Sequence, residues 1–303
     1  VPGIRVDSHS SGEEYATSVK VSDSAFPTTK FSKTTVNPRI AIKYEVTPSL
    51  VLRANIGTGF RAPYGFSEDL HLCSGSPRVW KSSNLKGERA ISYNLSADYY
   101  AKKYQFSINI FRTNLKDKIQ FSPADDEVKK FGYSYQWENV DDAYVQGVEL
   151  GAKANLFRNF NAGINWTFNQ GKFKHERADW SDPNDETVKE FPQRLQYAKD
   201  SRNISRFPAM TGDIDLDYTP GTWTFSLTSS LQGRMFIDYN SEDDGATSKI
   251  KKTNTFMIFN CRAAKRFGTC TVYAGAKNIF SYIQDEKHTD DAAFMYAPVY
   301  GAT

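Results

Sequence analysis

The run Gly57-Thr58-Gly59-Phe60-Arg61-Ala62 is the short motif most suggestive of chemistry, because it fits the pattern G-x-G-x-x-[GA]. Dinucleotide-binding folds place this pattern after a strand and open a helix with it, so that the helix N-terminus holds the pyrophosphate. Here Pro63 follows, and the next stretch, "YGFSEDLHLCSGSP", has no helical periodicity. The context therefore argues against a nucleotide site, and the glycines need another explanation.

Other catalytic motifs are also missing from the chain. It contains no G-x-S-x-G, no H-E-x-x-H and no P-loop, and "HERADW" from His175 lacks the second histidine of a zinc protease motif. The three cysteines, Cys73, Cys261 and Cys270, form no C-x-x-C pair, so neither a disulfide framework nor a structural metal is indicated. Cys261 and Cys270 could bridge one hairpin, but unpaired thiols are the favoured prediction. We do not expect an enzyme.

The elements that would position any site are strands, because apolar and polar residues alternate with period two. In "AISYNLSADYY" Ile91, Tyr93 and Leu95 share one face, whereas Ser92 and Asn94 share the other. The same alternation runs through "RIAIKYEV", "FNAGINWTFN" and "GDIDLDYTPGTWTFSLTSSLQG". Helical signal is scant, since Pro192 interrupts the one candidate, "DETVKEFPQRLQYAKDS". About twelve strands are predicted.

The connections between these strands alternate strictly between short and long. Tight turns are predicted at 46–49, 102–103, 158–159, 219–221 and 267–268, and long polar stretches near 9–35, 58–89, 123–131, 176–205, 241–252 and 281–293. In an up-and-down meander, this order places all tight turns at one end of the sheet and all long loops at the other. Outer-membrane barrels have this arrangement, together with strands that are apolar outside and polar inside.

The composition suits several β architectures, and a barrel in a membrane would explain its aromatic residues. Lys and Arg (38) nearly balance Asp and Glu (35), which gives no electrostatic reason to expect a nucleic-acid partner. The chain has 21 Phe, 17 Tyr and 5 Trp, yet its mean hydropathy is −0.57 and no apolar run reaches the ~18 residues of a spanning helix. The aromatic residues suit girdles at the membrane interfaces, with Tyr99, Tyr100, Phe160, Phe168, Tyr218, Trp223, Phe280 and Tyr282 as candidates. A soluble barrel with its apolar face inward is the alternative, but the segments exceed the usual ~5–6 residues of a soluble strand.

Both ends of the sequence look cut. "VPGIRVDSHSSG" has neither the basic start nor the apolar core of a signal peptide, and "FMYAPVYGAT" stops inside an alternating run. Sheet edges cannot face hydrocarbon unpaired. We therefore expect strands from an upstream part of the protein to complete the barrel.

Five segments in order resemble TonB-dependent outer-membrane receptors. Gly59-Phe60-Arg61-Ala62-Pro63 matches the family's G-[FY]-R-A-P strand end, and "SNLKGE", with Asn84 and Leu85, is similar to its "NPNLKPE" box but lacks both prolines. "ENVDDAYVQGVE", with Gly147 and Glu149, resembles the strand "N-V-x-x-A-x-x-x-G-V-E". "AGAKNIFSYIQDE" and "YAPVYGAT" resemble the last two strands, although Val299 stands where arginine is usual. The "GFRAP…SEDLH" run is most similar to receptors of Bacteroidetes-like bacteria.

The resemblance implies that residues 1–303 supply about twelve C-terminal strands of a 22-stranded barrel, with the plug domain and the first strands upstream. It implies active import of a scarce, bulky nutrient across the outer membrane, driven by TonB in the periplasm. Outer-membrane lipids would surround the protein, and a surface lipoprotein could assist it. A passive porin or an adhesin remains an alternative.

The resemblance also suggests ligands but no resident cofactor. Haem receptors of this family often carry a histidine where His71 stands, and a neutral imidazole can ligate haem iron, with His175 or His288 as a second ligand. Contacts to an aromatic or anionic ferric siderophore are expected among loop residues, with Tyr64, Phe66, Arg78, Trp80, Trp180, Arg194 and Tyr239 as candidates. Cobalamin is a third option.

Overall fold

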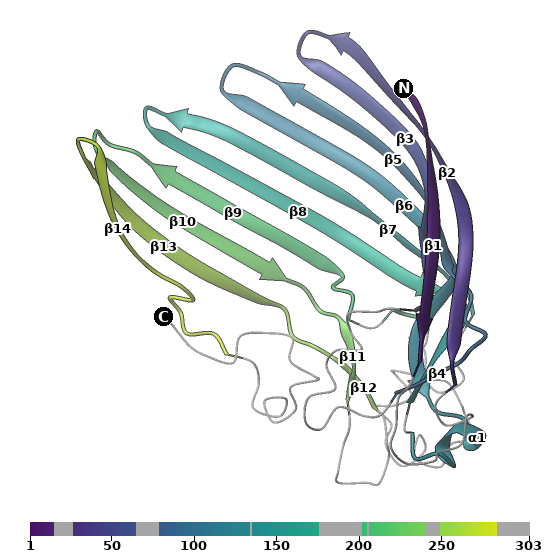
Figure 1. Ribbon diagram of the computed structural model, residues 1–303. Coiled ribbons are helices and arrows are strands. Elements are labelled where there is room, and N and C mark those ends of the chain that lie inside the picture. The colour runs from purple at the N-terminus through teal and green to yellow at the C-terminus, as the bar shows by residue number, and fades with distance from the viewer. Residues whose placement is uncertain are drawn as a thin grey trace.

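A computed structural model describes residues 1–14, 27–64, 79–133, 135–175, 202–204, 206–239 and 249–283. These residues form one large sheet of twelve strands, in which eleven neighbours follow the order β1-β2-β3-β5-β6-β7-β8-β9-β10-β13-β14. Every pair along this path is antiparallel. The predicted meander is therefore confirmed (Figure 1).

Most strands exceed the length typical of soluble sheets. The eleven antiparallel strands are β1 (Pro2–Glu13), β2 (Thr29–Thr47), β3 (Leu50–Arg61), β5 (Glu88–Tyr100), β6 (Tyr104–Pro123), β7 (Tyr135–Phe157), β8 (Phe160–Phe173), β9 (Met210–Tyr218), β10 (Trp223–Gln232), β13 (Phe256–Phe267) and β14 (Cys270–Ala276). The longest, β6 and β7, have 20 and 23 residues and form one tall hairpin.

Tight turns join the strands at one end of the sheet, as the sequence predicts. They follow β2, β5, β7, β9 and β13, whereas the connections after β1, β3, β6, β8 and β10 are long. Three of the turns place a residue in the left-handed region, namely Asn159 (φ 66°), Gly221 (φ 63°) and Gly268 (φ 57°). Glycine and asparagine tolerate that region best, which explains their presence in these turns.

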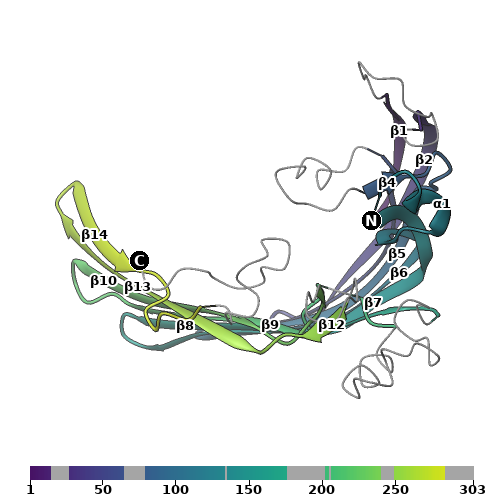
Figure 2. The same cartoon turned by 90° about the horizontal axis from the view of Figure 1, so that it is seen from below.

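The sheet bends into an open trough with one convex and one concave face (Figure 2). The convex face carries the apolar set of the alternation: Leu95 is 57% exposed, Ile42 61% and Phe106 50%. On the concave face, polar side chains bond across strands, with Asn94 Nδ2 donating to Asn55 Oδ1 at 2.9 Å and Asn109 Nδ2 to Glu149 Oε2 at 2.8 Å. The sheet is therefore apolar outside and polar inside, the reverse of a soluble barrel.

Four short elements were not expected. Strand β4 (Val79–Lys81) pairs in parallel with β7, β11 (Phe236–Tyr239) pairs with β12 (Lys249–Lys252), and one helical turn, α1 (Asp126–Lys129), lies between β6 and β7. The twelfth strand of the large sheet is β4. The expected final strand, at 296–303, lies outside the described residues.

Within the described residues, no helix has the length and apolar character needed to cross a membrane. Cys261 and Cys270 are both exposed free thiols, as the favoured prediction had it. Cys73 lies outside the described residues.

Candidate functional site at the long-loop rim

A small apolar cluster sits at the rim of the sheet, at the end that carries the long connections. Tyr64 and Leu85 come from the connection between β3 and β5, whereas Ile119 and Trp137 come from β6 and β7. All four are buried, and Phe31 of β2 packs against them. The Tyr64 hydroxyl donates to the Ser82 carbonyl at 2.8 Å, so the buried phenol is satisfied. The cluster anchors both ends of the β3–β5 connection to the β6–β7 hairpin.

Asn139 of β7 fastens the same connection through three hydrogen bonds. Its Oδ1 accepts from the Lys86 backbone N–H at 2.8 Å, and its Nδ2 donates to the Lys86 carbonyl at 2.9 Å. Nδ2 also donates to the carbonyl of Asp117 at 2.8 Å. Asp117 has a φ of 55° in the irregular part of β6, where the β6–β7 register shifts. One amide therefore holds a loop and a β-bulge together.

The motif residues on either side of this connection complete the rim. Glu88 accepts from the Ile119 backbone N–H at 2.5 Å and lies 3.8 Å from the Arg61 guanidinium. A Cβ added at Gly87 would lie 2.4 Å from the Phe60 ring and 3.0 Å from the Arg61 carbonyl oxygen, so a larger residue there would have to displace that ring. Phe60 and Arg61 of the motif thus take part in closing the rim of the sheet, together with Gly87 and Glu88. Gly57 and Gly59, the glycines that resemble a cofactor motif in the sequence, lie within β3, where an added Cβ would meet only ordinary contacts.

Replacing Asn139 with alanine should destabilise the rim. The substitution removes three hydrogen bonds to backbone groups, each worth ~0.5–1.5 kcal/mol. We therefore expect the free energy of unfolding to fall by about 2 kcal/mol. Limited proteolysis of the full-length protein should show faster cleavage between residues 64 and 85 in the variant. Asn114→Ala, which alters an amide on the neighbouring strand, is the matched control. Equal cleavage rates in the two variants would contradict the role given to Asn139.

The four described candidates for ligand contacts lie in four different places. Tyr64 belongs to the buried rim cluster, and Trp80 lies in β4 opposite Gln136 of β7. His175 follows the last residues of β8, and the backbone of Tyr239 lies in β11. Outside the described residues lie His71, Phe66, Arg78, Trp180, Arg194 and His288. Whether any of these residues contacts a ligand remains a prediction.

His175 is held in a defined orientation. Its side chain is 70% exposed, and Nδ1 lies 3.1 Å from Oδ1 of Asp141, while its backbone N–H donates to Oδ2 at 2.7 Å. Asp141 lies on β7, closer to the long connections than the apolar residues of that strand. Burial alone would raise the pKa of its carboxyl group. Hydrogen bonds from His175 and from the Asp142 N–H outweigh burial and keep this pKa below its usual value. A carboxylate on Nδ1 leaves Nε2 as the nitrogen available to a metal, the arrangement that many metal-binding histidines use.

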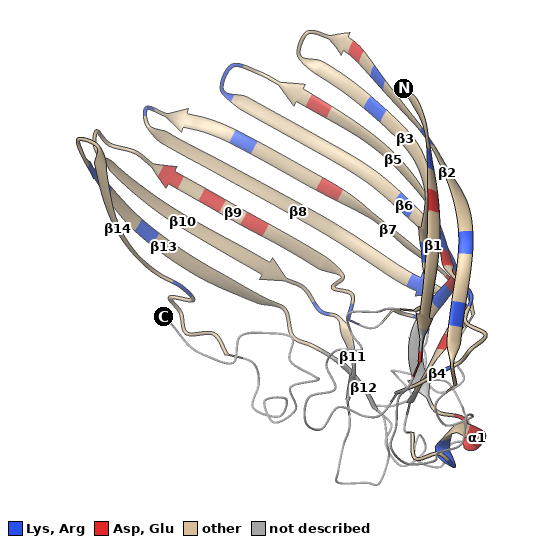
Figure 3. Cartoon of the chain, viewed as in Figure 1, with Lys and Arg blue, Asp and Glu red and all other residues tan. Residues whose placement is uncertain are grey.

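The concave face offers a polar path away from this rim. Three aspartates of β9, Asp213, Asp215 and Asp217, follow one another on this face and appear as red bands in Figure 3. Asn165 Nδ2 donates to Asp213 at 2.8 Å, and the Ser226 hydroxyl donates to Asp217 at 2.6 Å. The described residues include no group of three metal-ligating side chains. The hydrogen-bonded polar side chains of this surface can solvate a polar solute.

A sequence model of the family described as "TonB dependent receptor-like, beta-barrel" matches residues 1–279. The chain belongs to this family. Barrels of this receptor family lie in the outer membrane, so the convex face of the sheet is the lipid-facing side and the concave face lines the lumen. The predicted fold class and location are confirmed.

Individual relatives agree with this assignment. The vitamin B12 transporter BtuB of Photobacterium profundum is 26% identical over 266 residues, which is 86% of this chain and 36% of that protein. The ferric enterobactin receptor of Pseudomonas aeruginosa is 27% identical over 151 residues, or 44% and 20%. The solved structure of the copper transporter OprC covers 99% of the chain with a TM-score of 0.68 at 18% identity, and the chain covers 43% of it. This receptor chain thus spans about a third of the first curated relative.

Proposed function

We propose that the whole protein imports a scarce, bulky nutrient across the outer membrane, with energy supplied by TonB. The observation that supports this most strongly is the hydrogen-bonded polar lining behind an apolar outer face. That lining ends at a rim built by long connections. A ligand would be captured among the long connections and would pass along the concave face.

The coupling step lies outside this chain. TonB would act through a plug domain, which residues 1–303 do not include, and a surface lipoprotein could present the ligand at the rim. The chain itself would contribute the wall of the passage and half of the capture surface. The two hydrogen bonds between the Asn139 amide and the Lys86 backbone would keep the β3–β5 connection in place while the plug moves.

Iron complexes, either haem or a ferric siderophore, are the ligand class we propose. His175 supports haem, because Asp141 orients its ring and the exposed Nε2 can ligate iron. His71 is the other proposed ligand, on the strength of its position between the two family motifs. The similarity to a ferric enterobactin receptor supports the siderophore alternative.

Cobalamin is the second candidate ligand. The cobalamin transporter BtuB is similar to 86% of this chain, a larger share than the siderophore receptor matches. Cobalamin, like the iron complexes, is a bulky, polar metal complex that a polar lumen would admit.

Active import is tested by uptake in cells. The full-length gene would be expressed in an outer-membrane uptake mutant, and accumulation of ⁵⁵Fe-haem, a ⁵⁵Fe-siderophore and ⁵⁷Co-cobalamin would be followed with and without TonB. We expect accumulation of an iron complex that stops when TonB is deleted. Uptake that persists without TonB would indicate a passive pore, and no uptake of any complex would support an adhesin.

Haem ligation gives a prediction at the level of residues. Haem added to the purified full-length protein should produce a bound Soret band that His71→Ala and His175→Ala both weaken. Asp141→Asn should lower the haem affinity about tenfold, because partners that orient a metal ligand contribute 10–100-fold. His9→Ala, a histidine on β1, is the control. Tight cobalamin binding without binding of either iron complex would favour the second candidate.

A further inference from the structure

Three cations continue the apolar alternation on the outer, convex face of the sheet. On β5 the outward series runs from Leu95 and Tyr93 through Ile91 to Arg89. On β6 it runs through Ile110 to Arg112 and Lys116. The register confirms their shared face, because Arg89 lies opposite Lys116 and Arg112 lies opposite Tyr93. The cations therefore stand on the lipid-facing side, where the apolar band ends toward the long connections.

None of the three cations makes an ion pair with a residue that the structure describes. Arg112 is nevertheless fixed in place, since its guanidinium lies 4.3 Å from the Tyr144 ring centroid. It donates to Asn114 Oδ1 at 3.0 Å and to Gln146 Oε1 at 2.7 Å. These partners are neutral, so they orient the guanidinium and leave its charge uncompensated. An oriented, unpaired arginine is a suitable partner for a phosphate group.

The same cations line a hollow of about 860 Å³. Lys174 and Arg202 add two more positive charges to its wall, whereas Asp142 is the one described carboxylate there. Asp142 is already engaged, because its Oδ1 accepts from the Asp117 backbone N–H at 3.1 Å. The hollow is thus strongly cationic and complementary to an anion.

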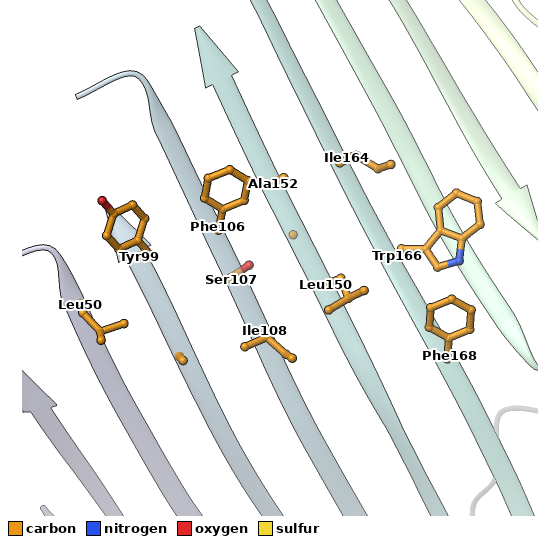
Figure 4. Close-up of a pocket in the computed structure, with 12 residues that line it drawn as sticks. Leu50, Tyr99, Phe106, Ser107, Ile108, Leu150, Ala152, Ile164, Trp166 and Phe168 are labelled. Atoms are coloured by element: carbon orange, nitrogen blue, oxygen red, sulfur yellow. The ribbon is translucent and has the colours of Figure 1, made fainter. Parts of the chain in front are cut away.

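An apolar groove continues from this hollow toward the tight-turn end. A second hollow, lined by Leu95, Ile110, Val148 and Phe168, shares Arg112 with the cationic one. A third shares Phe168 with the second, and its walls are Tyr99, Phe106, Ile108, Leu150, Ile164 and Trp166 (Figure 4). From Phe106 to Arg112, six residues of a tilted strand rise roughly 15 Å along the membrane normal, about half the thickness of the hydrocarbon core.

We propose that this surface binds a phosphorylated lipid of the outer leaflet. Its headgroup phosphate would contact Arg89, Arg112 and Lys116, and one acyl chain would lie along the apolar groove. The groove distinguishes such a lipid from a free anion, which has no apolar part to bury. The transported nutrient is a different ligand, because it passes the opposite, concave face. The inference rests on the membrane orientation of the sheet and not on the proposed import function.

Lipid retention by the purified full-length protein tests the proposal. The protein would be loaded with bisphosphorylated lipid A in detergent, washed, and analysed by native mass spectrometry. The triple variant Arg89→Gln, Arg112→Gln, Lys116→Gln should bind this lipid about 100-fold more weakly, because each cation near an anionic headgroup contributes about a factor of five. Lys153→Gln, which removes a cation from the concave face, should bind like the parent protein.

Further measurements decide between the sources of the phosphate. Dephosphorylated lipid A should be retained no better by the parent protein than by the triple variant. The variant Arg89→Lys, Arg112→Lys, Lys116→Arg keeps all three positive charges. It should retain the lipid far better than the triple glutamine variant does. Equal retention by the parent and a folded triple variant would overturn the proposal. Displacement of the lipid by millimolar inorganic phosphate would also overturn it, since it would indicate a site for free anions.

Discussion

Arginine in place of Leu95 should destabilise the folded barrel by ~2–4 kcal/mol, the cost of a cation at the lipid-facing midplane. Leu95 lies in the middle of β5, 57% exposed on the convex face, between Ala54 of β3 and Ile110 of β6. Its neighbours on that face are apolar, so a guanidinium placed there has neither water nor an anion to solvate it. Ile164→Arg on β8 should behave in the same way.

The adjacent residue provides the control. Asn94 lies on the concave face and bonds Asn55, so Asn94→Arg loses one exposed hydrogen bond while its cation stays in the lumen. We expect a cost of about 1 kcal/mol or less. Urea titrations of the full-length protein folding into lipid vesicles would measure the change in folding free energy for Leu95→Arg and for Asn94→Arg. Equal costs for Leu95→Arg and Asn94→Arg would contradict the assignment of the two faces.

Alanine in place of Gly147 should lower the free energy of unfolding by about 3 kcal/mol. This value is at the upper end of the destabilisation caused by inserting an extra carbon into a well-packed site. A Cβ built at Gly147 lies 2.2 Å from the Phe168 carbonyl oxygen and 2.8 Å from Cζ of Phe111. The Phe111 ring can rotate away, but the carbonyl belongs to the β7–β8 ladder, so the strands must separate locally. The glycine of the "G-V-E" motif is therefore required by strand packing.

Gly57→Ala is the matched substitution. Gly57 also lies within a long strand, β3, but the nearest atom to its Cβ is Arg39 Cβ at 3.6 Å, an ordinary contact. Alanine there should be neutral or slightly stabilising, because glycine is the entropically costlier residue in a strand. The same vesicle titration compares the folding free energies of the two variants. An unchanged stability of Gly147→Ala would contradict the close packing of β7 against β8.

Much of the sheet could be predicted from the sequence because its physics is local. Alternation such as Ile91, Tyr93 and Leu95 against Ser92 and Asn94 fixes both the strand and its faces. The tight turns follow from the same local chemistry, as at Gly221 and Gly268. Lipid outside and water inside demand this pattern along every strand, so it is repeated along the chain.

The rim could not be predicted, because its contacts join residues far apart in the sequence. Asn139 bonds Lys86 across 53 positions, and no local pattern marks that pair. For the same reason β4 and the bulge at Asp117 were missed. The cations Arg89 and Arg112 were overlooked, although the alternation that identified Ile91 and Ile110 continues directly into them.

The height of the β6–β7 hairpin sets where the protein first meets its surroundings. A tilted strand needs ~9–11 residues to cross the hydrocarbon, whereas β7 has 23, so about half of it stands clear of the bilayer. At ~3.3 Å per residue and a tilt near 45°, this projecting part rises roughly 30 Å above the hydrocarbon. The mouth of the receptor would then open toward the outside medium, where dilute solutes arrive. The same tall wall would be within reach of antibodies, phages and competing microbes.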